Sequence, residues 1–210
     1  DYDAEAVTRD PATGRLWLAW ETTNAITRHA PDMTLEREAR PAAMQGWGIN
    51  AGPEAMVRLR DGRFIVLREG FTQWHDSHRH RALVYSGDPL KPARVSEVRF
   101  AGPARFSPTD MAQLPDGRVL VLMRRLVWPL PYRFAGLIAL ADPQAIRGHA
   151  DWPAHAVARL SSNLPVDNFE GLAIEPRSDG RVTVWLISDD NNAVSQRTLL
   201  WKLSVDPRNL

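Results

Sequence analysis

The sequence contains no cysteine. Disulfides, thiolate metal ligands and a cysteine nucleophile are therefore excluded. The sequence also lacks the Gly-x-Ser-x-Gly motif that carries the nucleophile of α/β-hydrolase esterases, and it lacks a phosphate-binding P-loop. A classical serine esterase and a P-loop nucleotide hydrolase are accordingly disfavoured.

An excess of charge and a long apolar run are missing as well. The 26 basic and 25 acidic residues are dispersed and leave a net charge of +1, so we expect no surface for nucleic acid or for an anionic membrane. The longest apolar run, near residues 134–141, is far shorter than the roughly 20 residues that a membrane span needs. With 44% hydrophobic residues among 210, the chain can bury a substantial core as one domain.

A repeat of about fifty residues organises the chain. Each unit starts with an acidic residue and a short apolar stretch, turns at a glycine, and returns through a second apolar stretch. The leading acids are Glu5, Glu54, Asp110 and Glu170. Asp-Gly between two apolar runs is a strong signal for a β-hairpin. The predicted turns are Thr13-Gly14, Asp61-Gly62, Asp116-Gly117 and Asp179-Gly180.

Further short segments extend these hairpins toward four strands per unit. In the first unit, the third strand at residues 25–29 is followed by a polar stretch rich in Glu and Arg, and in the last unit a fourth strand is missing. Such units, with Gly and Pro at their turns, match the blades of a β-propeller. A β-sandwich is the alternative, but its strands do not repeat an acid, a turn and a strand in fixed order. We therefore predict an all-β fold, an incomplete β-propeller arc of about four blades in a single domain. The predicted blades are residues 1–48, 49–103, 104–162 and 163–210.

The chain opens directly on a repeat unit, at Asp1, without an initiator methionine or a signal peptide. We expect it to be a processed or truncated piece of a longer chain. The loss of N-terminal blades would account both for a start inside a blade and for an incomplete last blade.

The turns also predict which residues face each other, if each Asp-Gly pair is the centre of its turn. Glu170 then lies opposite Asp189, and Glu54 lies opposite Glu69. Glu5 lies near Glu21 in the same way. Like charges directly opposed across an antiparallel pair are destabilising, so such pairs need solvent, a cation or a function to explain them.

The first strand of each propeller blade lines the axial channel, so we expect the leading acids to approach one end of it. Carboxylate and amide oxygens are ligands for a hard cation such as Ca²⁺, which could bind a phosphate and polarise it for attack by water. The candidate catalytic residues are Glu170, Asp189, Asp190, Glu54 and Asp110. The candidate metal ligands are Glu170, Asp189, Asn191, Glu5 and Glu69.

Arg124, Arg125 and Asn168 are the candidate substrate-binding residues, because a guanidinium can hold a phosphate or carboxylate through two hydrogen bonds. The alternative interpretation is that the repeated acids occupy solvated strand ends. Charge is tolerated there and protects sheet edges from aggregation.

Several stretches resemble the phytase-like family, which is defined by the esterase-like activity of phytase. They are Asn-Phe-Glu-Gly-Leu-Ala at 168–173, Leu-Ile-Ser-Asp-Asp-Asn at 186–191 with Gln-Arg-Thr-Leu-Leu at 196–200, Pro-Thr-Asp at 108–110 with Leu-Pro-Asp-Gly at 114–117 and Arg124-Arg125, and Glu-Ala-Met at 54–56. They cover most of the chain, and the first two are the most specific. The resemblance implies a bacterial, commonly exported protein whose recurrent acids hydrolyse a phosphoester or ester.

Two function classes follow. One is a metal-dependent hydrolase of a phosphoester or ester, with a small-molecule substrate and Ca²⁺ as its expected cofactor. The other is a non-catalytic propeller whose channel mouth binds a small ligand or a partner protein. The resemblance implies a periplasmic or secreted protein, and the absence of cysteine is compatible with an oxidising compartment. Neither class includes a nucleic-acid partner or a membrane span.

Overall fold

The chain is almost entirely β-structure. The computed structural model describes residues 4–48, 51–68, 70, 78–127, 133–160 and 165–210. The helices in these ranges are three-residue 3₁₀ turns, η1 (Ala42–Met44), η2 (Pro143–Ala145) and η3 (Pro207–Asn209). No helix within the same ranges is long and apolar enough to span a membrane. The predicted all-β class is confirmed.

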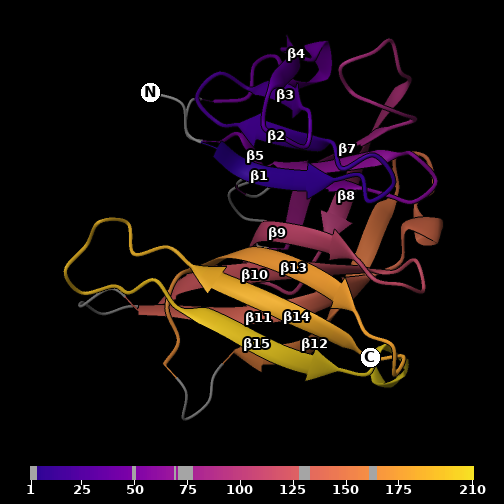
Figure 1. Cartoon of the computed structure of the whole chain (residues 1–210). Coiled ribbons are helices and arrows are strands. Elements are labelled where there is room, and N and C mark those ends of the chain that lie inside the picture. The colour runs from indigo at the N-terminus through magenta and orange to yellow at the C-terminus, as the bar shows by residue number, and fades with distance from the viewer. Residues whose placement is uncertain (1–3, 49–50, 69, 71–77, 128–132, 161–164) are drawn as a thin grey trace.

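Two of the three sheets follow the chain order (Figure 1). The first sheet contains β1 (Ala4–Arg9), β2 (Leu16–Trp20), β3 (Ala25–His29) and β4 (Leu35–Ala39). The last sheet contains β13 (Phe169–Pro176), β14 (Val182–Ser188) and β15 (Leu200–Val205). Neighbouring strands in both sheets are antiparallel.

The middle sheet combines the second and third sequence units. It runs in the order β5-β6-β7-β8-β12-β11-β10-β9. Its strands are β5 (Pro53–Arg58), β6 (Phe64–Arg68), β7 (Arg79–Tyr85), β8 (Val95–Ala101), β9 (Ser107–Gln113), β10 (Val119–Val127), β11 (Arg133–Ala141) and β12 (Asp151–Leu160). β8 and β12 pair in parallel, Arg99 with Asp151 and Ala101 with Pro153. The two units expected to form separate four-stranded sheets are therefore hydrogen-bonded into one eight-stranded mixed sheet.

The first strands of the four sequence units lie side by side. β1 contacts β5, β5 contacts β9, and β9 contacts β13. The arrows of β1, β9 and β13 point the same way in Figure 1. The beginnings of these strands therefore lie at one end of the molecule, and their hairpin turns lie at the other.

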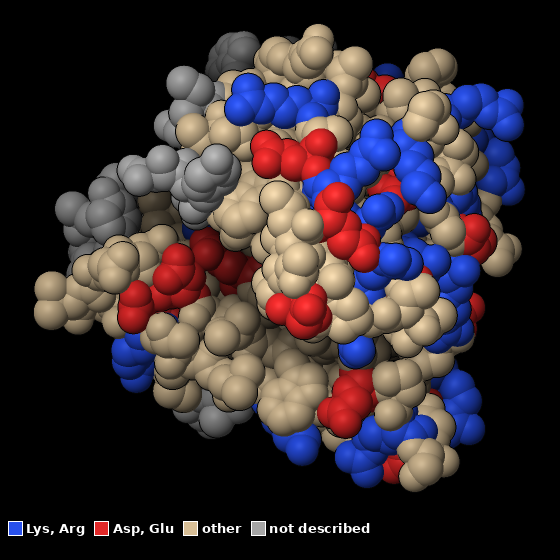
Figure 2. Space-filling view, turned by 45° about the horizontal axis from the view of Figure 1, so that its top comes forward, with Lys and Arg blue, Asp and Glu red and all other residues tan. Residues whose placement is uncertain are grey.

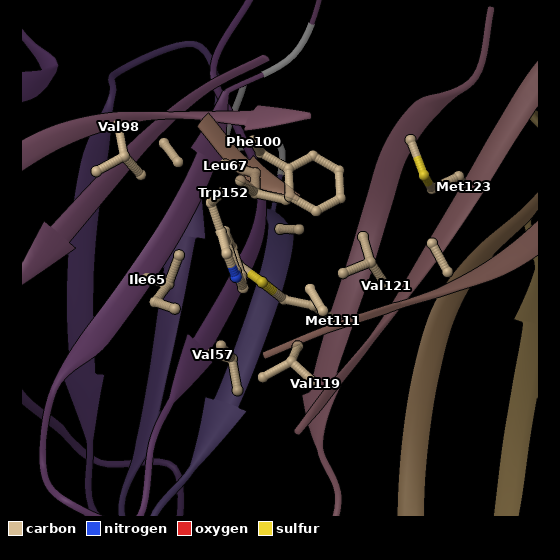
Figure 3. Packing of buried hydrophobic residues seen from close by; sticks show 14 of the residues in the cluster. Val57, Ile65, Leu67, Val98, Phe100, Met111, Val119, Val121, Met123 and Trp152 are labelled. Atoms are coloured by element: carbon tan, nitrogen blue, oxygen red, sulfur yellow. The ribbon is translucent and has the colours of Figure 1, made fainter. Parts of the chain in front are cut away.

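Apolar clusters fill the spaces between successive units. Trp17 of β2 packs edge-to-face on Phe64 of β6, with ring centroids 5.1 Å apart. Figure 3 shows the cluster between the second and third units, where Met111 lies between Val57 and Val121 in the view. Phe169 of β13 meets Trp201 of β15 at 4.9 Å in a third cluster, which also contains Leu120 and Leu122 of β10. Burial of these apolar side chains between neighbouring units therefore stabilises the side-by-side arrangement of the first strands, which carry the repeated acids.

All four predicted turns are present. Gly14, Gly62, Gly117 and Gly180 have φ values of +73°, +88°, +97° and +78°, in the left-handed region that glycine favours. The last three turns have three residues rather than two: in the second unit, Leu59 N donates to Arg63 O and Gly62 N donates to Leu59 O. This is the hairpin in which a type I turn is followed by a left-handed residue. The extra residue shifts the strand pairing by one position.

Candidate active site

A β-bulge interrupts the first strand of every unit near its beginning. In the pairing of β1 with β2, Ala4 and Ala6 are paired but Glu5 is skipped. The residues skipped in β5, β9 and β13 are Glu54, Thr109 and Glu170. A bulge leaves one residue out of the ladder and re-aims its side chain. The repeated position is therefore a bulge, and its third member is Thr109 rather than Asp110.

The predicted opposition of Glu170 and Asp189 is wrong. Phe169 pairs with Ser188, and the next pair is Gly171 with Ile187. Asp189 instead lies beside Asn168, whose carbonyl accepts its N–H at 2.9 Å. The longer turn shifts the register by one residue, and the bulge shifts it again.

The strand register also bears on the other two predicted acid pairs. Pro53 pairs with Arg68 and Ala55 with Leu67, so Glu54 has no residue directly opposite it. Its predicted partner, Glu69, lies outside the described residues. In the first unit the bulge places Ala4 opposite Trp20, so the register does not oppose Glu5 and Glu21.

A pocket of about 470 Å³ lies at the bulge end of the strands. Its charged lining is Glu54, Arg124 and Arg125. The other lining residues are Ser107, Pro108, Leu126, Phe134 and Gln196. The Glu54 side chain is buried. The pocket thus brings together residues from the second, third and fourth sequence units.

Arg124 connects this pocket to the bulge of β13. Its Nη1 donates to Asn168 Oδ1 at 2.8 Å, and its Nη2 lies 3.2 Å from Glu170 Oε1. Asn168 Nδ2 donates to the same Glu170 oxygen at 2.7 Å. Asn168 is fully buried, whereas the side chains of Arg124 and Glu170 are 27% and 30% exposed. A buried amide therefore fixes both charged groups where solvent can reach them.

Arg125, on the same strand, is differently placed. Its guanidinium lies 5.2 Å from the ring centroid of Phe106, and that of Arg124 lies 5.7 Å from the centroid of Phe134. No ion pair involves Arg125 among the described residues. Stacking on an aromatic ring leaves the N–H groups of an arginine available to an anion.

Asp110 lies beneath the site and not among the pocket lining. Its Oδ2 accepts the N–H of Leu172 at 2.7 Å, and its Oδ1 accepts the N–H of Met111 at 2.8 Å. Burial raises the pKa of Asp110 to about 7, although both hydrogen bonds lower it. The carboxyl group therefore ties the strand of the third unit to that of the fourth.

Thr109 completes this connection. Its hydroxyl is shared between Phe169 O at 3.3 Å and Leu122 O at 3.4 Å. Together with Asp110 it holds β13 on both sides of Glu170. The following Gly171 is also constrained, because a Cβ there would lie 2.5 Å from Ile187 Cγ2. These contacts fix the position of Glu170.

Asp189 and Asp190 shape the loop that follows β14. Their carboxylates accept the backbone N–H groups of Asn191 at 3.0 Å and Asn192 at 2.9 Å. Asp190 also accepts the hydroxyl of Thr198 at 3.1 Å. Asn191 Nδ2 donates to Gln196 Oε1 at 2.7 Å, and Gln196 lines the pocket. In the described structure these residues position one wall of the pocket.

The candidate metal ligands come from different parts of the described structure. No three Asp, Glu or His side chains lie close enough to share a cation in the part of the chain that the structure describes. Glu5 belongs to the first sheet and Glu170 to the last, while Asp189 and Asn191 make local loop contacts. Glu69 lies outside the described residues.

Asp167 and Gln196 are site residues that sequence reasoning missed. Asp167 is buried, and its two oxygens accept the N–H groups of Asn168 and Arg197, each at 3.0 Å. It therefore ties the start of the Asn-Phe-Glu-Gly motif to the loop that carries Gln196. Its position directly before that motif was the available signal.

Comparison with known proteins gives a family and a fold. A family model described as "Phytase-like: Esterase-like activity of phytase" matches residues 1–192 of the 210-residue chain. No curated protein matches the sequence. A solved protein of unknown function from Bacteroides caccae is 13% identical, with a TM-score of 0.45, and the match covers 97% of this chain and 82% of that one.

Two other solved structures are similar over most of this chain. A protein of unknown function from Dyadobacter fermentans DSM 18053 is 11% identical, with a TM-score of 0.53 and coverage of 96% of this chain and 66% of that one. A hypothetical protein from Leishmania major is 14% identical, with a TM-score of 0.50 and coverage of 95% and 65%. The chain thus spans about two thirds of the length of these two proteins. At such identity the likeness shows the fold alone.

Proposed function

The chain belongs to the phytase-like family, and from this premise we propose that it hydrolyses a phosphoester or ester at the pocket lined by Glu54 and Arg124. The observation that carries the proposal is the contact of Arg124 with Asn168 and Glu170 at the pocket. An oriented guanidinium can hold a phosphoryl or carboxylate oxygen, and a nearby carboxylate can accept a proton from water.

Each residue has a distinct role in this proposal. Arg124 and Arg125 bind the oxygens of the substrate and stabilise the charge that grows on them. Glu54 acts as the general base. The water oxygen bonds to phosphorus or to the carbonyl carbon while one water proton passes to Glu54. The bond to the leaving oxygen then breaks, and that oxygen takes the proton from Glu54 and leaves as an alcohol, which restores the Glu54 carboxylate. Glu170 is a positioning residue that orients Arg124.

The finer architecture is part of the same proposal. We interpret the sheets as blades of a β-propeller, whose first strands surround a channel. Two features support this interpretation: the side-by-side contacts of β1, β5, β9 and β13, and the apolar clusters between successive units. The greater length of the two similar structures is compatible with further blades in a longer protein.

Calcium and export stay proposals. Glu54 and Glu170 could offer oxygens to Ca²⁺ near the pocket, but Arg124 already neutralises Glu170, so we derive no step through a metal. A periplasmic or secreted location rests on the family resemblance alone.

A binding protein without catalysis is the second candidate. One observation favours it: the same Glu170 oxygen contacts both Arg124 and Asn168, an arrangement suited to a fixed recognition surface. In that case a ligand would bind to Arg125 and would not be hydrolysed.

Turnover of chromogenic substrates tests the proposal. p-Nitrophenyl phosphate, bis-p-nitrophenyl phosphate and p-nitrophenyl acetate are incubated with the chain, with and without Ca²⁺. We expect turnover of at least one substrate, lost in Glu54→Gln and Arg124→Gln and kept in Arg37→Gln, which alters an exposed arginine of β4. Equal turnover in all variants would point to a contaminant and contradict the proposal. Saturable binding without turnover would favour the binding protein.

A further inference from the structure

A second pocket lies toward the turn end of the first strands. It has a volume of about 420 Å³ and is lined by residues of β1, β5, β9 and β13. Its polar lining includes Thr8, Arg9, Arg58, Arg60 and Gln113. We call it the turn-end groove. A volume of this size is typical of small-molecule sites.

The charged residues that line this groove are basic. Its lining includes three arginines and no Asp or Glu among the described residues. Arg58 is partly neutralised by Asp10, with Nη1 and Oδ1 3.3 Å apart. Arg9 and Arg60 form no ion pair within the described part of the chain. Two guanidinium groups that have no carboxylate partner among the described residues therefore border the groove.

Neighbouring contacts hold one of these arginines in place. Arg60 Nη1 donates to Pro115 O, and its backbone N–H donates to Gln113 Oε1 at 2.8 Å. These bonds join the second and third units at the groove and fix the direction of Arg60. On the side of the molecule where the turns lie, at the right in Figure 2, Lys and Arg side chains gather on the surface with Asp and Glu side chains among them.

Apolar side chains that are not fully buried also line the groove. Val7 of β1 is exposed, and Leu16 of β2 and Ile174 of β13 are half-buried. A ligand that matches this surface therefore has an anionic group and an apolar body.

We propose that the turn-end groove is a binding site, separate from the candidate active site, for a small organic phosphate or carboxylate. Its anionic group contacts Arg9 and Arg60, and its apolar part lies against Val7 and Ile174. This assignment does not depend on hydrolysis, because the pocket with Glu54 and Arg124 has a different lining at the bulge end.

Phenylphosphonate is a suitable probe, because its P–C bond is not hydrolysed and it combines a dianion with an apolar ring. Titration calorimetry with the whole chain at fixed ionic strength should show saturable binding at millimolar concentration. We expect the double variant Arg9→Gln, Arg60→Gln to bind at least about tenfold more weakly. The matched variant Arg37→Gln should bind as the parent does. Inorganic phosphate should compete only weakly, since it lacks the apolar part.

Arg125→Gln separates the two pockets, because Arg125 lines only the first of them. Binding that survives Arg125→Gln and is lost in the double variant assigns the probe to the turn-end groove. Binding that is lost in Arg125→Gln and kept in the double variant places it at the candidate active site and overturns the proposal. Absence of saturable binding to the parent chain also overturns it. Equal thermal midpoints for parent and double variant control for unfolding.

Discussion

The hairpin turns and the bulges of the first strands are built from different kinds of contact. In the last three turns, the Asp carboxylate accepts the N–H of the arginine two residues later, at 3.0 Å for both Asp61 with Arg63 and Asp116 with Arg118. At the bulge end, side chains reach between sequence units, as Arg124 does to Asn168. The first kind of contact is local and exposed, and the second is long-range and partly buried.

The local contacts of the turns thus serve folding, whereas the long-range contacts at the bulges can serve function. Exposed ion pairs between residues close in sequence contribute little to stability, but they specify where the chain reverses. Long-range contacts form only in the complete fold, and they can hold a charged group in a fixed geometry. The bulge end is therefore where we place catalysis, and changes at the two ends should have unequal effects.

The largest expected effect is on turnover. Glu54→Gln at the bulge end removes the proposed base and should lower kcat/KM by at least about 100-fold. Asp61→Asn at the turn end should leave kcat/KM essentially unchanged. Steady-state kinetics on the best chromogenic substrate provide the measurement. Similar losses in both variants would remove the functional distinction between the ends.

The second largest expected effect is on the free energy of unfolding. Asp110→Ala leaves the buried N–H groups of Leu172 and Met111 without an acceptor and should lower the free energy of unfolding by about 2–3 kcal/mol. Asp116→Ala, at an exposed turn, should lower it by less than about 1 kcal/mol. Urea unfolding of both variants measures the difference. A smaller loss for Asp110→Ala than for Asp116→Ala would contradict the comparison.

The two ends should also respond to pH in opposite directions. Burial raises the pKa of Asp110 to about 7, so the folded state holds its proton over a range where the unfolded state has lost it. Its contribution to stability is present below about pH 4 and is lost as pH rises through about 7. The hydrogen bond from Arg177 lowers the pKa of Asp179, whose contribution is lost as pH falls. Unfolding across this pH range should show that Asp110→Asn removes the first dependence and leaves the second.

Calcium should have the smallest effect. A cation at the bulge end would have to displace Arg124 from Glu170, so we expect only a slight rise in Tm over millimolar Ca²⁺. Glu170→Gln or Asp189→Asn should abolish it, and Asp179→Asn at the turn end should not. A rise that all three variants retain would place the cation elsewhere.

Much of the fold could be predicted because its signals are local. The turn glycines and alternating strands are visible in the sequence, and all four hairpins follow from them. The register could not be predicted, because a three-residue turn and a bulge each shift it by one residue. Strand β4 was missed because Leu35–Ala39 is exposed along most of its length and lacks alternation. The parallel pairing of β8 with β12 joins segments that no local pattern connects.

The sequence indicated several residues of the candidate site but did not predict how they are arranged in space. Glu54, Arg124, Asn168 and Glu170 were singled out, and the structure brings them to one region. Thr109 was missed as the third bulge residue because the sequence units were aligned on their acidic residues, which placed Asp110 at that position. Glu54 and Thr109 each precede their turn glycine, Gly62 and Gly117, by eight residues, so this shared spacing of the two middle units was the available signal. The long-range contacts of Asp110 have no counterpart in the sequence pattern.

The parallel joint between β8 and β12 has a consequence for the order of unfolding. Beside it, the Asp151 carboxylate accepts hydrogen bonds from Arg79 at 2.9 Å and from Arg99 at 2.7 Å. The second and third units cannot open separately without breaking this joint, so they should behave as one cooperative unit in native-state hydrogen exchange. The outer sheets, which share no backbone ladder with it, should exchange first. The candidate active site lies across this boundary, with Arg124 on the slow side and Glu170 on the fast side, so local opening of the last sheet would dismantle the site while most of the molecule stays folded.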